Sequence, residues 1–590
     1  MRRSLLKFPV LLLFLLILFS ATVEGREIKI QVAVTADVHG RFFSYDFVKN
    51  QPAGASLAHI DYLRQAMKQR QESNLILLDN GDLIQGTPAA YYANFVQDAD
   101  ENMIARVMNY VGFDAATIGN HDIEAGPEVY NRLREEFDFP WLGANVLDEE
   151  SGEPYFAPYT VIERDRVRVA VLGLTTTGVP TWLPPQLWEG LVFEDMVESA
   201  AYWVDYIRKN EQPDAIVGLF HSGFGSLDPD TDSHPLEHAS GYVAKNVPGF
   251  DVIFSAHDHR RLVQTVTNVK GDPVLVLGPG HFAEHLAVAE LTFERESRRT
   301  FTLKGVEGDM ISSSRVVPRR EFVNTFEDDV TEILRFANER VGELTAPMHS
   351  MEALFGSAPF TDLVHEIQLS LTEADISFTA PLAFDETIRK GPLYMRDFFR
   401  LYEYENYLYT MELTGSEILD YLEYSYGLWL NEMEDKNDYL LNVHQDALGR
   451  IPDNRRGRGV LKNPPYNFDS AAGIRYTVDV SLPVGERVDI QGMEDGTEFD
   501  PDAVYVVAIN SYRGSGGGGH LTSGAGIPHD KLSNRIVNTT EKDLRSYMVE
   551  FFRDAGSYTP ESRNNWEIIP AEWGKRGREK VEPYLRDDEL

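Results

Sequence analysis

The sequence has no cysteine among its 590 residues, so neither a disulfide framework nor a lipid-anchored cysteine is available to it. It also lacks an excess of positive charge, because 55 Lys and Arg residues stand against 93 Asp and Glu, for a formal net charge of −38. Nucleic-acid polymers and anionic membrane surfaces are bound through basic patches, so we expect neither as a main partner. A small anionic substrate is compatible with this acidic composition, since bound cations reverse the electrostatic field at their site.

Long apolar runs are missing too, except at the start of the chain. The first 25 residues pass from the basic MRRSLLK through the apolar FPVLLLFLLILF to the small-residue stretch SATVEG, which is the order of a secretory signal peptide. The alternative is a membrane anchor, but a span needs about 20 apolar residues. We predict that residues 1–25 are a signal peptide, cut after Ala21 or Gly25. The mature protein would then be periplasmic or extracellular, with no stable membrane span.

Short apolar runs alternate with helix-like stretches from residue 28 onward. The runs end in polar residues: REIKIQVAVTADVHG, NLILLDNGD, VRVAVLGLTTTG, DAIVGLFHSG and DVIFSAHDH. They have the length and composition of strands, and helical patterns such as residues 57–70 and 196–209 separate several of them. This alternation predicts an α/β layered domain, whose sites gather at the carboxyl ends of the strands.

Residues 324–344 read as one long amphipathic helix, with Asn324 or Thr325 as its cap and acidic residues in its first turn. Such a helix either packs on the first domain or connects two domains. Because it follows the last polar strand end, we predict a linker helix over residues 323–350.

The character of the sequence changes after this segment. Residues 398–415 are an aromatic run, FFRLYEYENYLYTMELTG, and residues 505–520 read YVVAINSYRGSGGGGH, a strand pattern followed by a glycine-rich loop. We predict a second domain over residues 351–572 and a charged tail over residues 573–590.

Polar residues gather at the predicted strand ends in five motifs: TADVHG, NGDLIQG, GNHDIE, FHSG and AHDHR. They supply carboxylates, imidazoles and one amide: Asp37, His39, Asp82, Asn120, His121, His221, His257 and His259. Hard and borderline cations bind this mixture of ligands. In an extended segment, residues i and i+2 point the same way, so each D-x-H or H-x-H pair can offer two ligands to one centre. The motifs therefore predict a metal centre.

With these motifs in this order, the sequence resembles the calcineurin-like metallophosphoesterase superfamily and, within it, the 5′-nucleotidase and 2′,3′-cyclic-nucleotide 2′-phosphodiesterase family. The resemblance covers essentially the whole mature chain. It implies an α/β (α+β) fold class, with a four-layer metallophosphoesterase β-sandwich flanked by helices over residues 26–322. It also implies a C-terminal α/β nucleotide-binding domain, and small-molecule nucleotides as the binding partners.

The resemblance further implies two divalent metal ions, with zinc, manganese, iron and cobalt all compatible. It divides seven ligands between them: Asp37, His39 and His259 on the first ion, Asn120, His221 and His257 on the second, and Asp82 as a bridge. Two ions bring four positive charges and the two carboxylates remove two, which leaves a net charge suited to a phosphate ester. A hydroxide between the ions is the expected nucleophile, because a bound cation lowers the pKa of water.

His121 takes the place of the family's catalytic histidine, which stabilises phosphoryl charge and protonates the leaving alcohol. The alternative is a supporting role in the metal site. Family members usually carry an Asp three residues after this histidine, and this chain has Glu124 there. The carboxylate is one methylene longer, and we hypothesise that Glu124 orients His121.

The family's second domain stacks the nucleobase between two aromatic rings, and stacking accepts every base. The matching residues are Tyr404, with Tyr402 as a neighbouring candidate, and Tyr512 before the glycine-rich loop. The alternative is that the aromatic run is core.

The 5′-nucleotidases of the family usually carry an NGGGIR-like stretch, whose arginine holds phosphate. Residues 377–384 read SFTAPLAF in that region and contain no arginine, which favours the 2′,3′-cyclic-nucleotide 2′-phosphodiesterase/3′-nucleotidase branch. Arg513 and Arg389 are candidates for a replacement clamp, which would restore 5′-nucleotide use. We therefore expect an exported metallophosphoesterase acting on nucleotides. The alternatives are a 5′-nucleotidase or UDP-sugar hydrolase, and a non-catalytic nucleotide-binding surface protein.

Overall fold

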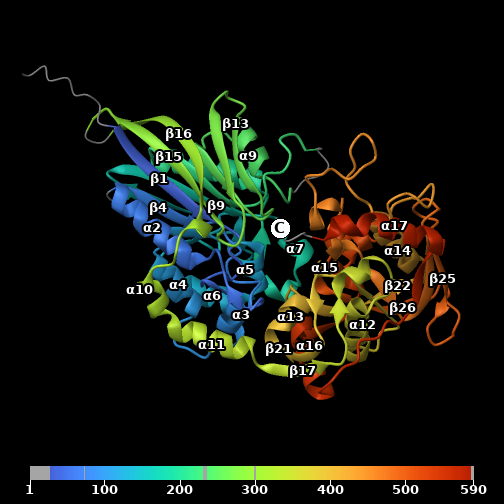
Figure 1. Cartoon of the computed structure of the whole chain (residues 1–590). Helices are drawn as coiled ribbons and strands as arrows, with labels where there is room; N and C mark the ends of the chain where they lie inside the picture. The colour runs from blue at the N-terminus through green and yellow to red at the C-terminus, as the bar shows by residue number, and fades with distance from the viewer. Residues whose placement is uncertain (1–26, 72–73, 230–235, 298–299, 587–590) are drawn as a thin grey trace, which may run out of the picture.

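The computed structural model of the chain describes residues 27–71, 74–229, 236–297 and 300–586 (Figure 1). The predicted signal peptide, residues 1–25, lies outside the described residues. Within the described part of the chain, no helix combines the length and the apolar character that a membrane span requires.

Two six-stranded sheets form the first domain (Figure 1). The first sheet has the strand order β16 (Phe301–Ser312), β15 (His285–Arg295), β1 (Glu27–Thr35), β4 (Leu75–Asp79), β5 (Ala115–Thr117) and β6 (Trp141–Leu142). The second has the order β13 (Arg261–Thr267), β14 (Pro273–Pro279), β12 (Val252–Ser255), β11 (Ala215–His221), β9 (Val167–Thr175) and β8 (Tyr159–Arg164). Apolar side chains of both sheets form one core between them; β1 contributes Ile28, Ile30, Val32 and Val34 in the predicted alternation.

Helices cover the outer faces of both sheets. The first sheet is covered by α2 (Leu57–Gln71), α4 (Met103–Val111) and α6 (Pro127–Glu136), and the second by α8 (Met196–Asn210) and α9 (Ser240–Asn246). Shorter elements complete the domain: β2 (Tyr45–Asp46), β3 (Gln51–Pro52), α3 (Pro88–Tyr91), α5 (Asn120–Glu124), β7 (Val146–Asp148), α7 (Val179–Trp182) and β10 (Leu191–Phe193). The layers follow the order helix, sheet, sheet, helix, which confirms the expected four-layer β-sandwich.

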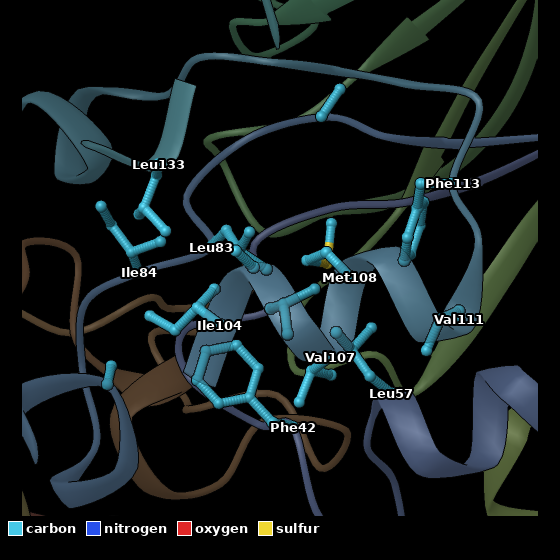
Figure 2. Close-up of a cluster of buried hydrophobic side chains, with 14 of the residues drawn as sticks. Phe42, Leu57, Leu83, Ile84, Ile104, Val107, Met108, Val111, Phe113 and Leu133 are labelled. Atoms are coloured by element: carbon cyan, nitrogen blue, oxygen red, sulfur yellow. The ribbon is translucent and has the colours of Figure 1, made fainter. Parts of the chain in front are cut away.

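The core beneath the first sheet fixes one of the predicted ligand loops. Figure 2 shows α4 directing Ile104 and Met108 into this core, where they meet Leu83 and Ile84. Leu83 and Ile84 are each 1% exposed and follow directly after Asp82. Burial of such a side chain contributes about 1.5–3 kcal/mol, so hydrophobic packing holds the Asp82 loop in place.

The prediction of a single linker helix over residues 324–344 is wrong. The structure has two helices and a strand there: α10 (Arg320–Thr325), α11 (Glu327–Ala337) and β17 (Arg340–Leu344). Phe326 separates the helices with φ −110° and ψ 17°, and its ring packs with that of Phe322 in the first domain's core. Arg106 and Asp329 form two hydrogen bonds of 2.9 Å, so α11 packs on the first domain.

The second domain is built around a five-stranded sheet with helices on both faces (Figure 1). Its strand order is β23 (Ser470–Ala472), β19 (Ile376–Thr379), β26 (Val504–Asn510), β22 (Tyr407–Thr414) and β27 (Ile536–Asp543). The helices are α12 (Pro359–Leu371), α13 (Met395–Leu401) and α16 (Leu544–Ala555) in one apolar cluster and α14 (Gly415–Trp429) in the other. Smaller elements include β18 (Met348–His349), β20 (Thr387–Ile388), β21 (Gly391–Tyr394), β24 (Ile474–Asp479), β25 (Val488–Met493), α15 (Ser511–Gly514) and β28 (Trp566–Ile569). The expected C-terminal α/β domain is therefore confirmed.

The predicted charged tail is not a tail as far as residue 585, because helix α17 (Ala571–Leu585) occupies this part of the chain. Val581 and Leu585 are fully buried in the second domain's core. Gly577 lies so close to Leu440 that an added Cβ would stand 2.9 Å from its backbone nitrogen. The helix thus packs on the domain through a few small or apolar residues. The sequence pattern does not reveal them, because charged residues flank them.

Candidate active site

The topology brings the five polar motifs to one edge of the sandwich. Strands β1, β4 and β5 run parallel in the first sheet, and β9, β11 and β12 run parallel in the second. Carboxyl ends of parallel strands meet at the same edge of a sheet. The motifs follow these ends, so residues distant in sequence become neighbours.

Asp37, His39 and His259 form the first candidate metal cluster, in which the ligand atoms all lie within 4.8 Å of one another. His39 Nε2 is 3.1 Å from His259 Nε2, and His259 Nε2 is 3.6 Å from Asp37 Oδ1. These are the three residues that the family resemblance implies as ligands of the first ion.

Asp82, His221 and His257 form the second cluster, again with ligand atoms within 4.8 Å of one another. His221 Nε2 lies 3.2 Å from Asp82 Oδ2 and 3.1 Å from Asn120 Oδ1. Asp82 Oδ2 also lies 4.0 Å from His39 Nε2. Asp82 therefore stands between the two clusters, where a bridging ligand is expected. A third group, Glu237, His238 and His257, shares His257 with this cluster.

Backbone groups orient the candidate ligands. His221 Nδ1 lies 2.7 Å from the carbonyl oxygen of Asn80, so its N–H donates there and leaves Nε2 free to bind a cation. The Asp122 carboxylate accepts hydrogen bonds from the backbone N–H groups of Asp82, at 3.0 Å, and Gly119, at 2.8 Å. Asp122 thus ties two of the motif loops together.

Most of the candidate ligands have left-handed backbone conformations. The φ angles of Asp37, His39, Asp82, His257 and His259 are 48°, 47°, 54°, 71° and 57°. The extended geometry that we expected for the D-x-H and H-x-H pairs is therefore wrong, because these loops turn sharply after the strands. Such conformations each cost about 1–3 kcal/mol and are concentrated at functional sites.

Burial controls the charges of these groups. It lowers the pKa of His39 to about 3 and that of His259 to about 2, so both imidazoles are neutral, as metal coordination requires. Burial also raises the pKa of Asp37 well above its usual range. For Asp82, the nearby His221 and His121 outweigh burial and hold the pKa well below its usual range. Burial also lowers the pKa of His221, but the Asp82 carboxylate outweighs it and raises the pKa to about 9, so His221 would have to lose a proton to bind a cation. Carboxyl and imidazole groups together are a donor set that fits divalent cations.

His121 and Glu124 lie on one face of α5 and are in contact. His121 Nδ1 is hydrogen-bonded to Glu124 Oε2, and the His121 backbone N–H donates to Asp82 Oδ1 at 2.9 Å. Burial lowers the pKa of His121, but the Asp82 and Glu124 carboxylates outweigh it and raise the pKa to about 10. Cations beside Asp82 would offset part of this effect. The His121 ring lies 5.4 Å from that of His39, so it borders the first cluster.

The second domain places Tyr404 and Tyr512 near one another, both half-buried. An added Cβ at Gly517 would lie 2.6 Å from the Tyr512 ring, so glycine is required for this close approach. Tyr402 is fully buried and accepts a hydrogen bond from Asn406, which makes it core.

Sequence reasoning missed Tyr466, whose ring lies 6.5 Å from that of Tyr404 at an interplanar angle of 80°. The sequence feature that could have indicated Tyr466 is an aromatic residue directly after two prolines, in NPPYNF. The tyrosines adjoin the metal clusters, because α15 packs against α7 and the Trp182 ring of α7 stacks on His257 at 5.4 Å. Glu237 also influences the pKa of both Tyr466 and Tyr512.

Of the two arginines suggested as phosphate clamps, Arg513 is placed differently from that expectation, and the role of Arg389 stays a prediction. The Arg513 side chain is 1% exposed, and all its N–H groups bond within the protein, to Asp469, Asn467, Gly517 and Tyr466. It therefore supports the glycine-rich loop from beneath. Arg389 is exposed after β20, and its side chain has no hydrogen bond or ion pair within the described residues.

Comparison with known proteins matches both domains to families. Residues 30–261 match the calcineurin-like phosphoesterase family, and residues 340–523 match the 5′-nucleotidase C-terminal domain. A 2′,3′-cyclic-nucleotide 2′-phosphodiesterase/3′-nucleotidase of Yersinia enterocolitica is 25% identical over 95% of this chain and 91% of its own length. The trifunctional nucleotide phosphoesterase protein of Bacillus subtilis is 27% identical over 95% of this chain, which spans 41% of that longer protein.

A solved structure shares the fold of both domains over most of the chain. The putative 5′-nucleotidase of Staphylococcus aureus aligns with 92% of this chain and 100% of its own, with a TM-score of 0.73 and 21% sequence identity. The predicted family and fold class are thus confirmed. The chain belongs to the family that joins a calcineurin-like phosphoesterase domain to a 5′-nucleotidase C-terminal domain, and it is a hydrolase of the nucleotidase and phosphodiesterase class.

Proposed function

We propose that this protein is an exported, metal-dependent hydrolase that opens 2′,3′-cyclic nucleotides and removes phosphate from 3′-nucleotides. In the first reaction water adds to phosphorus and the P–O2′ bond breaks, which leaves a 3′-nucleotide. In the second the P–O3′ bond breaks, which leaves a nucleoside and inorganic phosphate. The observation that carries the proposal is the contact of the His121–Glu124 pair with two adjacent ligand clusters. The absence of an arginine from residues 377–384 and the name of the Yersinia relative support the choice of branch.

The ligand assignment follows the two clusters. Asp37, His39 and His259 would hold one divalent ion, Asn120, His221 and His257 would hold the other, and Asp82 would contact both. Zinc, manganese, iron or cobalt, when bound, supplies Lewis-acid chemistry and water of lowered pKa. The protein contributes the rigid loops that present these ligands at one edge of the sandwich.

His121 is the proposed general acid. Glu124 accepts the Nδ1–H of His121 and thereby fixes the ring, so Nε2 is left to face the substrate. A protonated Nε2 stabilises negative charge on the phosphoryl oxygens and then transfers its proton to the departing ribose oxygen. Tyr404 and Tyr512 are proposed to hold the base by stacking, which makes the site tolerant of base identity.

Export rests on the predicted signal peptide, and the proposed location is the periplasm or the cell exterior. N-terminal sequencing of the protein recovered from outside the cytoplasm tests this, and a mature terminus directly after Ala21 or Gly25 is expected. An uncleaved N-terminus would contradict export through a signal peptide.

The activity is tested by incubating the metal-loaded protein separately with 2′,3′-cyclic AMP, 3′-AMP and 5′-AMP and separating the products. We expect the cyclic ester to open to 3′-AMP and then to adenosine, and we expect His121→Ala to abolish both steps. Turnover of 5′-AMP alone would identify a 5′-nucleotidase instead. A protein that binds no metal and turns over none of the three would be a non-catalytic binding protein.

A further inference from the structure

An arginine from another part of the chain lies beside residues 377–384, the stretch that lacks the family's arginine. Residues 377–384 run from β19 into the loop that precedes β20, and Phe384 lies in this loop. The Arg458 guanidinium carbon lies 5.8 Å from the centre of the Phe384 ring. Arg458 belongs to a short 3-10 turn, Gly457–Val460, which lies far from this stretch in the sequence.

Other arginines near the tyrosines have hydrogen-bond and ion-pair partners, whereas Arg458 has none among the described residues. Arg513 is occupied by Asp469 and the glycine-rich loop, and Arg545 is occupied by Glu405 and the backbone carbonyls of the Tyr404 segment. The Arg458 side chain is exposed, and no hydrogen bond or ion pair ties it to any residue that the structure describes.

The stretch that Arg458 covers packs beside the tyrosines, because Leu382 and Ala383 belong to the apolar cluster against which Tyr404 and Tyr466 pack. Burial raises the pKa of both tyrosines, and the Arg458 charge offsets part of that rise. Arg458 therefore lies beside the tyrosine site, over the stretch that lacks the family's arginine.

We propose that Arg458 binds the phosphate of a nucleotide whose base is stacked by Tyr404 and Tyr512, and that it is a specificity-determining residue of the site. The inference rests on the proposed function and extends it. A guanidinium offers paired N–H donors that match phosphate oxygens, and the Arg458 guanidinium has no carboxylate partner among the described residues although the chain has a net charge of −38. The phosphate-binding arginine has in this view moved from the 377–384 stretch to the 457–460 turn.

A matched control lies in the same turn. Arg456 precedes Arg458 by two residues, but its guanidinium lies over the Tyr584 ring at 5.3 Å and bonds to the Arg455 carbonyl. Arg456→Gln therefore removes the same charge from the same loop without touching the tyrosine site.

The test measures binding to full-length mature protein loaded with Mn²⁺, in a His121→Ala background that prevents turnover. Isothermal calorimetry compares 3′-AMP with adenosine, which lacks phosphate. Arg458→Gln should weaken 3′-AMP binding about 10- to 100-fold, the range for a lost charge-assisted hydrogen bond, and leave adenosine binding within twofold. Arg456→Gln should change neither. In the His121-containing enzyme, Arg458→Gln should raise KM for 3′-AMP, whereas Arg456→Gln should leave that KM unchanged.

Three results would overturn the inference. Unchanged 3′-AMP binding in Arg458→Gln would show that the arginine does not contact phosphate. An equal loss of 3′-AMP and adenosine binding would show that it supports the tyrosines instead. A protein that binds neither ligand before Arg458 is changed would refute the proposed nucleotide function, and this inference with it.

Discussion

Replacing Asp469 with Asn tests how the glycine-rich loop beside the proposed nucleobase site is held. Asp469 is 3% exposed and accepts hydrogen bonds from Arg513 Nε and Nη2, both at 3.0 Å. It also accepts the hydroxyl of Tyr421, while Arg513 holds the carbonyl oxygen of Gly517 at 2.6 Å. Asp469→Asn therefore leaves the Arg513 cation buried without its counter-charge.

Breaking a buried ion pair by removing one partner costs about 3–5 kcal/mol, because the remaining charge stays out of water. The same substitution in an exposed pair costs about 0–1 kcal/mol. Asp446 and Arg450 form such an exposed pair in the same domain, with side chains 32% and 68% exposed. Asp446→Asn is thus a control that removes an identical charge from a solvated site.

The assay is urea unfolding followed by tryptophan fluorescence, with separate transitions fitted because a two-domain chain does not unfold in one step. Trp429 stacks on Phe468, the neighbour of Asp469, at 5.4 Å and therefore contributes to the signal of the second domain. We expect Asp469→Asn to lower the urea midpoint of that transition strongly. Asp446→Asn should leave the midpoint near the value of the unmodified protein. Equal midpoints in the two variants would refute the argument. If Arg513 were instead a free phosphate clamp, Arg513→Gln would weaken nucleotide binding without loss of stability.

Three further predictions follow from the same contacts. Burial raises the pKa of Asp469, but the Arg513 charge outweighs it and lowers the pKa below its usual value. The stability that separates Asp469→Asn from the unmodified protein should therefore be complete above about pH 4, the ordinary Asp value, and be lost as the pH falls through the lowered pKa, measured as urea midpoints against pH. Glu124→Gln should reduce turnover of 3′-AMP about 10- to 100-fold, since Glu124 orients His121; unchanged turnover across the pH range would contradict that role. Tyr512→Ala should weaken adenosine binding by about 1–3 kcal/mol in calorimetry, whereas hydrolysis of bis(p-nitrophenyl) phosphate should persist.

The sequence predicted the first domain well because the relevant signals are local. Alternating apolar residues such as Ile30 and Val32 form a buried strand, and polar residues follow directly at its end. The motif residues consequently lie together in the structure, although their roles as metal ligands stay predictions. The left-handed turn at Asp37 was not predictable, because no glycine or asparagine marks it in the sequence.

The errors arose where tertiary contacts override a local pattern. The apolar periodicity continues past Ala337, but the chain leaves the helix there and β17 pairs with β21 of the second domain. In the predicted tail, charged residues surround Val581 and Leu585, and only the core that receives these side chains identifies the segment as structured. The ion pair between Arg513 and Asp469 joins two segments that are far apart in the sequence. The composition around the glycine-rich loop therefore could not predict it.

The connection between the two domains is shorter than the linker predicted over residues 323–350. The Asp329 side chain fastens α11 to the first domain, whereas the carbonyl oxygen of Glu339 accepts a hydrogen bond from Met395 N–H of the second domain at 2.9 Å. Only Asn338 lies between the end of α11 at Ala337 and this contact. The proposed metal ligands and the tyrosines belong to different domains, so their separation depends on this joint and on the packing of α7 against α15. A rotation that changed the distance between the proposed base and metal sites would act close to Asn338, and it would also disturb the packing of Phe336, near the end of α11, on an apolar cluster of the second domain.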